Sequence, residues 1–158
     1  MKIWNFGYEK SKKFAKKIYS KIGRIPCPAF DGELVAFTSV GFNHLIHKGY
    51  IPRTRNEQKR RFVLVQYAEE IIKNPRAEIT FRQTEEKYLV NRHGQKVLVT
   101  SVANFWTFHT DINKCAVKLV VRQIGQGQKQ FQSIMGDDIK IHRGKYKEEQ
   151  RGKTKKPS

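Results

Sequence analysis

The stretch that decides the fold class is CAVKLVVRQIGQGQKQFQSIM, residues 115–135. Its first half alternates, so Lys118, Val120 and Arg122 fall on one face of a strand and apolar side chains on the other. The apolar face holds Cys115, Val117, Leu119 and Val121. The Gly-Gln-Gly triplet at 125–127 is typical of a turn between strands. The stretch therefore predicts an antiparallel hairpin with one buried face.

Strand-like segments also precede this hairpin. They are short, rich in β-branched and aromatic residues, and comprise 77–83, 87–92, 96–102 and 104–110. Residues 91–94 carry a turn signal, and 33–38 form either a further short strand or a lead-in to the domain. We expect a twisted antiparallel β-sheet of four to five strands.

Three helices are predicted before most of these strands. Residues 8–22 form a basic amphipathic helix that Gly23 ends, and residues 39–49 form a short helix with Ser39 as N-cap and Gly49 as C-cap. The clearest helix spans 56–73. Its largely apolar face holds Arg61, Leu64, Val65, Ala68 and Ile72. Helices followed by an antiparallel sheet indicate an α+β fold, with the N-terminal helices packed on one sheet face and the other face free.

Charge divides the chain into three parts. It has 32 Lys+Arg against 14 Asp+Glu, a formal net charge of +18. Residues 1–29 are predicted to be a basic helix and linker, 30–136 an α+β domain, and 137–158 a basic, disordered tail. Clustered Lys and Arg neutralise phosphates and release counterions. The sequence therefore predicts a polyanion as partner, and RNA above all, whether tRNA, mRNA or the ribosome.

Several function classes are not indicated by any motif. The sequence has no phosphate-binding P-loop, no HExxH and no Cys/His zinc spacing, and its carboxylates form no cluster for two metal ions. Cys27 and Cys115 stand outside any motif. No apolar run approaches the ~20 residues of a membrane-spanning helix. We expect a cytoplasmic protein that uses no metal and no cofactor.

RNA can be cut without a metal, because its own 2′-OH can attack the adjacent phosphorus. The protein then supplies a base, an acid and positive charge on the phosphoryl oxygens. His44, His47 and Lys48 fall on one face of the predicted short helix and offer these groups, and Arg122 with Ser133 can complete the set from the hairpin. The ordinary alternatives are solvated histidines, a lysine placed by the helix dipole and a strand serine.

The chain also resembles a known family. The residues that carry the resemblance are TSVGFNHLIHKG (38–49), PRTRNEQKRRFVLVQYAEEIIKNP (52–75) and VKLVVRQIGQGQKQFQSIM (117–135). They resemble the barnase/EndoU/colicin/RelE-like nuclease superfamily, in particular its phage- and mobile-element-associated branch. The resemblance implies two helices on a mostly four-stranded antiparallel sheet and a metal-independent, often toxin-like endoribonuclease activity. A protein that neutralised such a toxin, as an antitoxin or immunity protein, would be acidic.

Site residues follow from this resemblance by position. It implies His44 as the acid/base group, Lys48 and Arg53 as phosphate contacts, and Arg122 with Ser133 as residues of the last strands. Further RNA contacts are assigned to three polar residues, His47, Lys118 and Gln130.

Two other functions stay open. A non-catalytic RNA- or ribosome-binding protein on the same fold would need only the charge, and a DNA-binding protein ranks third because no helix-turn-helix is found. A ribonuclease needs more than charge. It requires His44 to be exposed and within reach of Arg122 or Lys118.

Overall fold

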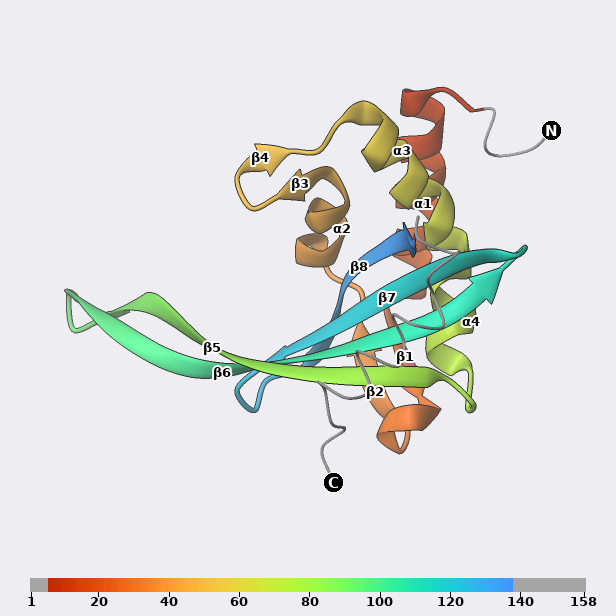
Figure 1. Ribbon diagram of the computed structural model, residues 1–158. Helices are drawn as coiled ribbons and strands as arrows, with labels where there is room; N and C mark the ends of the chain where they lie inside the picture. The colour runs from red at the N-terminus through yellow and green to blue at the C-terminus, as the bar shows by residue number, and fades with distance from the viewer. Residues whose placement is uncertain (1–5, 138–158) are drawn as a thin grey trace.

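The structure is a computed structural model that describes residues 6–137, and its main sheet has six strands (Figure 1). Their order is β1-β2-β8-β7-β6-β5, and neighbours are antiparallel except for β2 and β8, which are parallel. The strands are β1 (Arg24–Cys27), β2 (Glu33–Ala36), β5 (Glu78–Arg92), β6 (Gln95–Ile112), β7 (Cys115–Ile124) and β8 (Lys129–Asp137). The predicted antiparallel sheet is thus present in the main, but it is larger than four to five strands.

The helices alternate with the first strands. They are α1 (Tyr8–Ile22), α2 (Ser39–Ile46), α3 (Arg55–Leu64) and α4 (Ala68–Lys73), with 3₁₀ turns at Pro28–Phe30 and Val65–Tyr67. A small second sheet pairs β3 (His47–Lys48) with β4 (Ile51–Pro52). The α+β class is confirmed. The expectation that the helices all come first is wrong, because β1 and β2 lie between α1 and α2 and join the main sheet.

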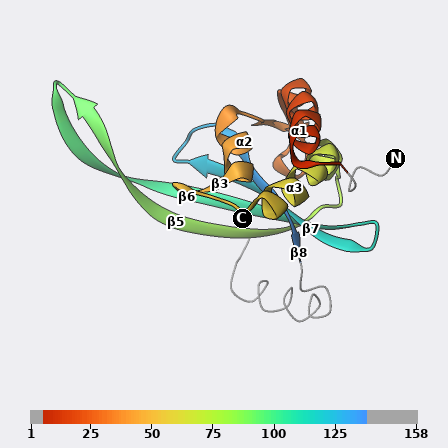
Figure 2. The same ribbon diagram turned by 90° about the horizontal axis from the view of Figure 1, so that it is seen from above.

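One hydrophobic core joins the helices to the sheet. In β7 the buried residues are Ala116, Val117, Leu119 and Val121, while Lys118 and Arg122 stay partly exposed on the face opposite Val117, Leu119 and Val121. The alternation predicted for the hairpin is therefore confirmed from Val117 onward, while at the start of the strand Cys115 is exposed beside the β6–β7 turn and Ala116 is buried. Figure 2 shows α1, α2 and α3 gathered on one side of β5, β6 and β7.

Helix α1 and strand β1, which precede residue 30, belong to this core. Ala15 and Tyr19 of α1 and Ile25 and Cys27 of β1 are all buried in it. The helix predicted for residues 8–22 has the observed bounds. Of the predicted tail, residues 138–158 lie outside the described residues. Within the described part of the chain, no helix is long and apolar enough to cross a membrane.

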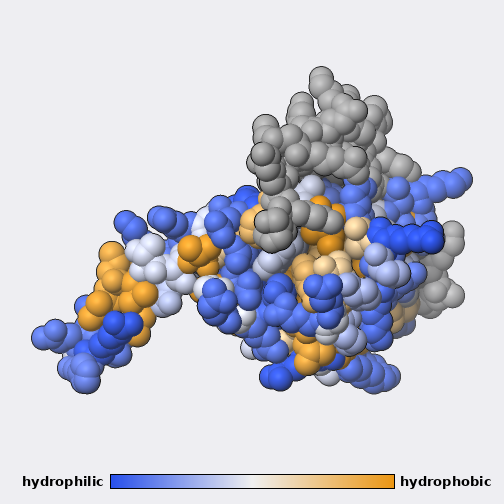
Figure 3. Space-filling view, turned by 90° about the horizontal axis from the view of Figure 1, so that it is seen from below, coloured by the Kyte–Doolittle hydropathy of each residue, from blue (hydrophilic) through white to orange (hydrophobic). Residues whose placement is uncertain are grey.

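The four short strands predicted between residues 77 and 110 are joined in pairs into two long strands, β5 and β6. Their turn is the predicted one, with positive φ at His93 and Gly94. The outer part of this hairpin, residues 85–102, which we call the arm, extends away from the rest of the molecule (Figure 1). Its exposed apolar residues are Tyr88, Leu89, Val97, Leu98 and Val102. Figure 3 shows an apolar patch on this projection beside a polar end.

Candidate active site

A cavity of about 230 Å³ lies between α2 and the β7–β8 hairpin. His44 and Val40 of α2 line it from one side. Arg122 of β7 and three glutamines of the hairpin, Gln128, Gln130 and Gln132, line it from the other. His44 is partly exposed and shares this cavity with Arg122. The two residues that the ribonuclease hypothesis requires to lie close together therefore line the same cavity.

The edge of β8 explains why α2 lies so close to the hairpin. β2 pairs only with Lys129 and Gln130, so α2 and α3 rather than a strand pack along the rest of β8. Gly41 of α2 is buried, and a Cβ there would clash with the carbonyl oxygen of Phe131. A glycine at this position lets the helix backbone approach the strand. The close approach sets His44 against the cavity.

Burial and positive neighbours act on His44 together. Burial lowers the pKa of His44 from its ordinary value, and the charges of Arg122, Arg53 and Arg61 lower this pKa further. Arg53 is held in place because its Nε donates to the carbonyl oxygen of His44 at 3.0 Å. A histidine with a lowered pKa is neutral at physiological pH, which is the state that can accept a proton.

Arg122 belongs to a row of side chains that crosses the sheet face opposite the core. The register places Arg82, Phe105, Arg122 and Gln130 side by side on four neighbouring strands. The guanidinium groups of Arg82 and Arg122 lie 4.4 Å and 5.8 Å from the Phe105 ring centroid. Glu86, at the base of the arm, accepts a hydrogen bond from Arg122 Nη2. The Phe105 ring is only 7% exposed, so two guanidinium groups flank a buried aromatic ring on this sheet face.

Two residues that line this cavity each have a buried side-chain atom without a partner. Among the described residues, the buried side-chain nitrogen and oxygen atoms without a hydrogen-bond partner are Arg122 Nε and Gln132 Oε1. Burying a polar group without a partner costs about 1–3 kcal/mol. Such atoms are therefore uncommon, and two in one cavity point to groups that a ligand completes.

Arg61 is a residue of this region whose role the sequence reasoning missed. It is only 6% exposed, its Nη1 donates to Ser133 Oγ at 2.6 Å, and its Nε donates to Glu57 Oε1 at 3.0 Å. The signal was present, because a guanidinium on an otherwise apolar helix face needs a buried partner. Ser133 is held by this bond and does not line the cavity.

The predicted helix face of His44, His47 and Lys48 does not form. The N-cap of the helix is Thr38, not the predicted Ser39, which is the first residue of the helix. The helix ends at Ile46, because the backbone is extended at His47. His47 and Lys48 instead form β3, which a turn with positive φ at Gly49 connects to β4. The predicted 39–49 helix is therefore too long, and only His44 of the three faces the cavity.

Gln130, a predicted RNA contact, does line the cavity, where its Oε1 accepts a hydrogen bond from the Thr38 hydroxyl at 3.2 Å. Lys118 lies on the same sheet face, opposite His109 on β6, but outside the cavity. His47 Nδ1 lies 3.1 Å from Asn43 Oδ1, and Lys48 is exposed. The RNA contacts assigned to these residues stay predictions.

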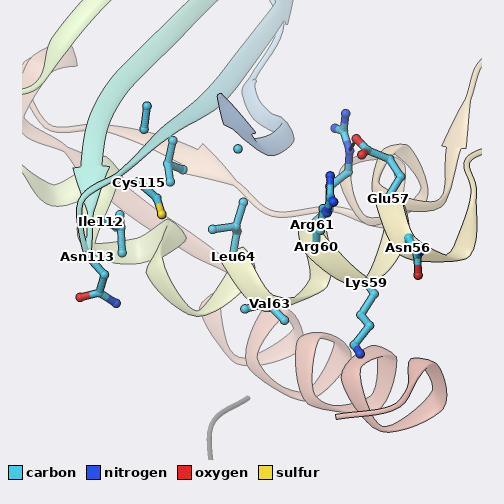
Figure 4. A pocket seen from close by; sticks show the side chains of 13 residues that line it. Asn56, Glu57, Lys59, Arg60, Arg61, Val63, Leu64, Ile112, Asn113 and Cys115 are labelled. Carbon is cyan, nitrogen blue, oxygen red and sulfur yellow. Dashed lines mark hydrogen bonds and ion pairs between the residues drawn. The ribbon is translucent and has the colours of Figure 1, made fainter. Parts of the chain in front are cut away.

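A larger cavity, of about 650 Å³, lies between α3 and the β6–β7 turn (Figure 4). Leu64 of α3 faces Ile112 and Cys115 across it. It contains neither histidine nor the partnerless atoms described above. Among residues 6–137, no three His, Cys, Asp or Glu side chains are grouped so that they could hold a metal ion.

Comparisons with protein-family models, with curated proteins and with solved structures found no significant match to this chain. The resemblance to the nuclease superfamily therefore stays a prediction.

Proposed function

We propose that the protein is an endoribonuclease that cuts RNA by attack of the 2′-OH and needs no metal ion. The observation that carries this proposal is the pairing of His44 with Arg122 in one cavity, where Arg122 Nε is buried and has no partner. A phosphoryl oxygen is the kind of acceptor that such a guanidinium group takes.

Each group in the cavity has a role in this reaction. Neutral His44 takes the proton from the 2′-OH, and the 2′-oxygen then attacks the phosphorus. Arg122 stabilises the negative charge that grows on the phosphoryl oxygens. The bond to the 5′-oxygen breaks, and this oxygen takes a proton from a water molecule, whose hydroxide then takes the proton held by His44. The products are a 2′,3′-cyclic phosphate and a 5′-hydroxyl.

Two further arginines, Arg53 and Arg61, act on His44 through their charge without taking part in the reaction. The charges of Arg53 and Arg61 lower the pKa of His44. Arg53 donates a hydrogen bond to the His44 carbonyl oxygen, and Arg61 donates one to Ser133. Their fixed positions preorganise positive charge before the substrate binds, which is the arrangement that stabilises a charged transition state.

A second candidate function rests on a different observation. Helix α1 exposes Lys13, Lys16 and Lys17 to solvent, and the whole chain carries a net charge of +18. This charge alone is enough for an RNA- or ribosome-binding protein that does no chemistry. Such a protein would bind RNA in a salt-dependent way and leave it intact.

The two functions separate in one assay. Purified wild-type protein and the His44→Ala variant are incubated with tRNA and with mRNA in EDTA, and the products are separated on denaturing gels. We expect wild-type cleavage with 2′,3′-cyclic phosphate ends, and a loss of about 100-fold or more in the variant, the usual contribution of a general base.

A matched control uses the histidine at the arm turn. His93→Asn keeps a residue that tolerates the positive φ at this position and should cleave like the wild type. Intact RNA with the wild-type protein would overturn the nuclease proposal in favour of binding alone. Cleavage that EDTA abolishes would overturn the metal-free mechanism.

A further inference from the structure

The β7–β8 hairpin contains a bulge at the cavity. Val120 pairs with Ser133 and Val121 pairs with Phe131, so Gln132 is an extra residue without a partner across the strand. A bulge redirects a side chain and is found often beside active sites. Here it brings Gln132 into the lining of the cavity together with Gln130.

The amide of Gln132 has an unused acceptor. Its Oε1 is buried and has no hydrogen-bond partner. In Gln130 the amide oxygen already accepts a hydrogen bond from the Thr38 hydroxyl, so its NH₂ group is the part that remains to donate. The residues that line the cavity therefore include a buried acceptor on Gln132 and a donor on Gln130. The Arg122 guanidinium that we assign to phosphate lines the same cavity.

We propose that Gln132 and Gln130 form a nucleobase subsite that selects adenine next to the phosphate to be cut. This inference rests on the proposed function. Glutamine pairs with adenine because its amide oxygen accepts from the N6 amino group while a ring nitrogen of the base accepts in return. The N6 amino group satisfies Gln132 Oε1, and Gln130 donates to a ring nitrogen.

The size of the cavity agrees with a single base. At about 230 Å³ it is smaller than the roughly 300–1,000 Å³ of sites for whole drug-sized ligands. Weaker binding of other bases follows from the partnerless Oε1 of Gln132. A base that presents a carbonyl oxygen to Gln132 Oε1 places two acceptors against each other and leaves both unpaired.

The test uses short RNAs that differ in one base. The full-length protein is given the oligonucleotide UUUAUUU and versions in which inosine or purine riboside replaces the adenosine. Inosine replaces the N6 donor with an acceptor, and purine riboside removes the donor alone. We expect cleavage beside adenosine to exceed cleavage beside inosine by about tenfold or more, with purine riboside in between.

The Gln132→Ala variant should cut the three oligonucleotides at nearly equal rates, because the acceptor that reads the base is gone. Gln126→Ala is the matched control, since Gln126 is exposed on the turn of the same hairpin and does not line the cavity. It should keep the wild-type preference. Circular dichroism melting of both variants checks that they are folded.

The outcomes separate this inference from the proposal beneath it. If the wild-type protein cuts neither these oligonucleotides nor any RNA of greater length, the nuclease proposal fails. If it cuts RNA without preference, prefers inosine, or keeps its preference in Gln132→Ala, only the adenine subsite fails.

Discussion

The β7–β8 hairpin and the arm are both antiparallel ribbons, yet they differ in what covers them. The hairpin buries Leu119, Val121 and Phe131 under the helices and presents Arg122 and Gln130 on the other face. The arm has no such layer. Its cross-strand pair of Leu89 and Leu98 is 63% and 60% exposed. The same strand geometry therefore gives a packed scaffold in one place and an unsupported projection in the other.

The difference teaches where a precise site can be built. Polar groups converge at the hairpin because α2 and α3 pack along β8 and fix the backbone on which His44 and Arg61 stand. Sites on such rigid elements hold their geometry well. The arm contributes to the site only through its base, where Glu86 bonds Arg122.

The largest expected effect compares one leucine in each ribbon. Leu119→Ala removes a side chain that is 0% exposed and should lower the free energy of unfolding by about 2–5 kcal/mol, through lost burial and a new cavity. Leu89→Ala, on the arm, should change it by no more than about 0.5 kcal/mol. Urea denaturation followed by circular dichroism measures both. A large loss in Leu89→Ala would mean that the arm is packed rather than free.

The next effect concerns two ion pairs with the same helical spacing. Arg61→Met leaves Ser133 and Glu57 without their donor and should cost about 1–3 kcal/mol of unfolding free energy. Lys73→Met breaks the exposed pair with Glu69 and should cost no more than about 0.5 kcal/mol. The same denaturation experiment serves. Equal losses in the two variants would show that the buried contacts of Arg61 add nothing to stability.

The contrast between the ribbons also explains which parts of the fold the sequence predicts. The hairpin was predictable because burial on one face forces an alternation of apolar and polar residues. The same holds for α1, which has one buried stripe including Ala15 and Tyr19. Where no face is buried, as along the polar residues 84–87 at the base of the arm, no alternation of apolar and polar residues exists. Two long strands therefore had the pattern of four short ones.

The site was predictable only in part, because it depends on contacts between distant segments. His44 and Arg122 carry a chemical signal in their residue types, and the structure brings them to one cavity. The end of α2 at Ile46 depends on the β3–β4 pairing, which local spacing does not reveal. The bulge at Gln132 depends on the register against β7. Neither feature follows from propensities of single segments.

The smallest expected effect is a pH dependence of the unfolding free energy that arises from His44, beside the β7–β8 hairpin. His44 has a lowered pKa in the folded chain, because burial and the neighbouring arginines disfavour its charged form. In the unfolded chain it takes a proton near its ordinary pKa of about 6.5. Above that pH both states are neutral and the contribution is constant. As the pH falls below it, the unfolded state binds more protons, and the folded state loses stability.

Urea denaturation of the wild type and of His44→Gln, from about pH 7.5 down to about pH 5, tests this dependence. The wild type should lose more unfolding free energy than the variant over this range, because only the wild type has a group whose protonation is penalised on folding. Inorganic phosphate bound by Arg122 would offset the positive charge around His44, so it should shift the NMR titration midpoint of His44 upward. Equal slopes for both proteins would mean that His44 takes up a proton as readily in the folded chain as in the unfolded one, and that burial and the neighbouring arginines do not disfavour its charged form.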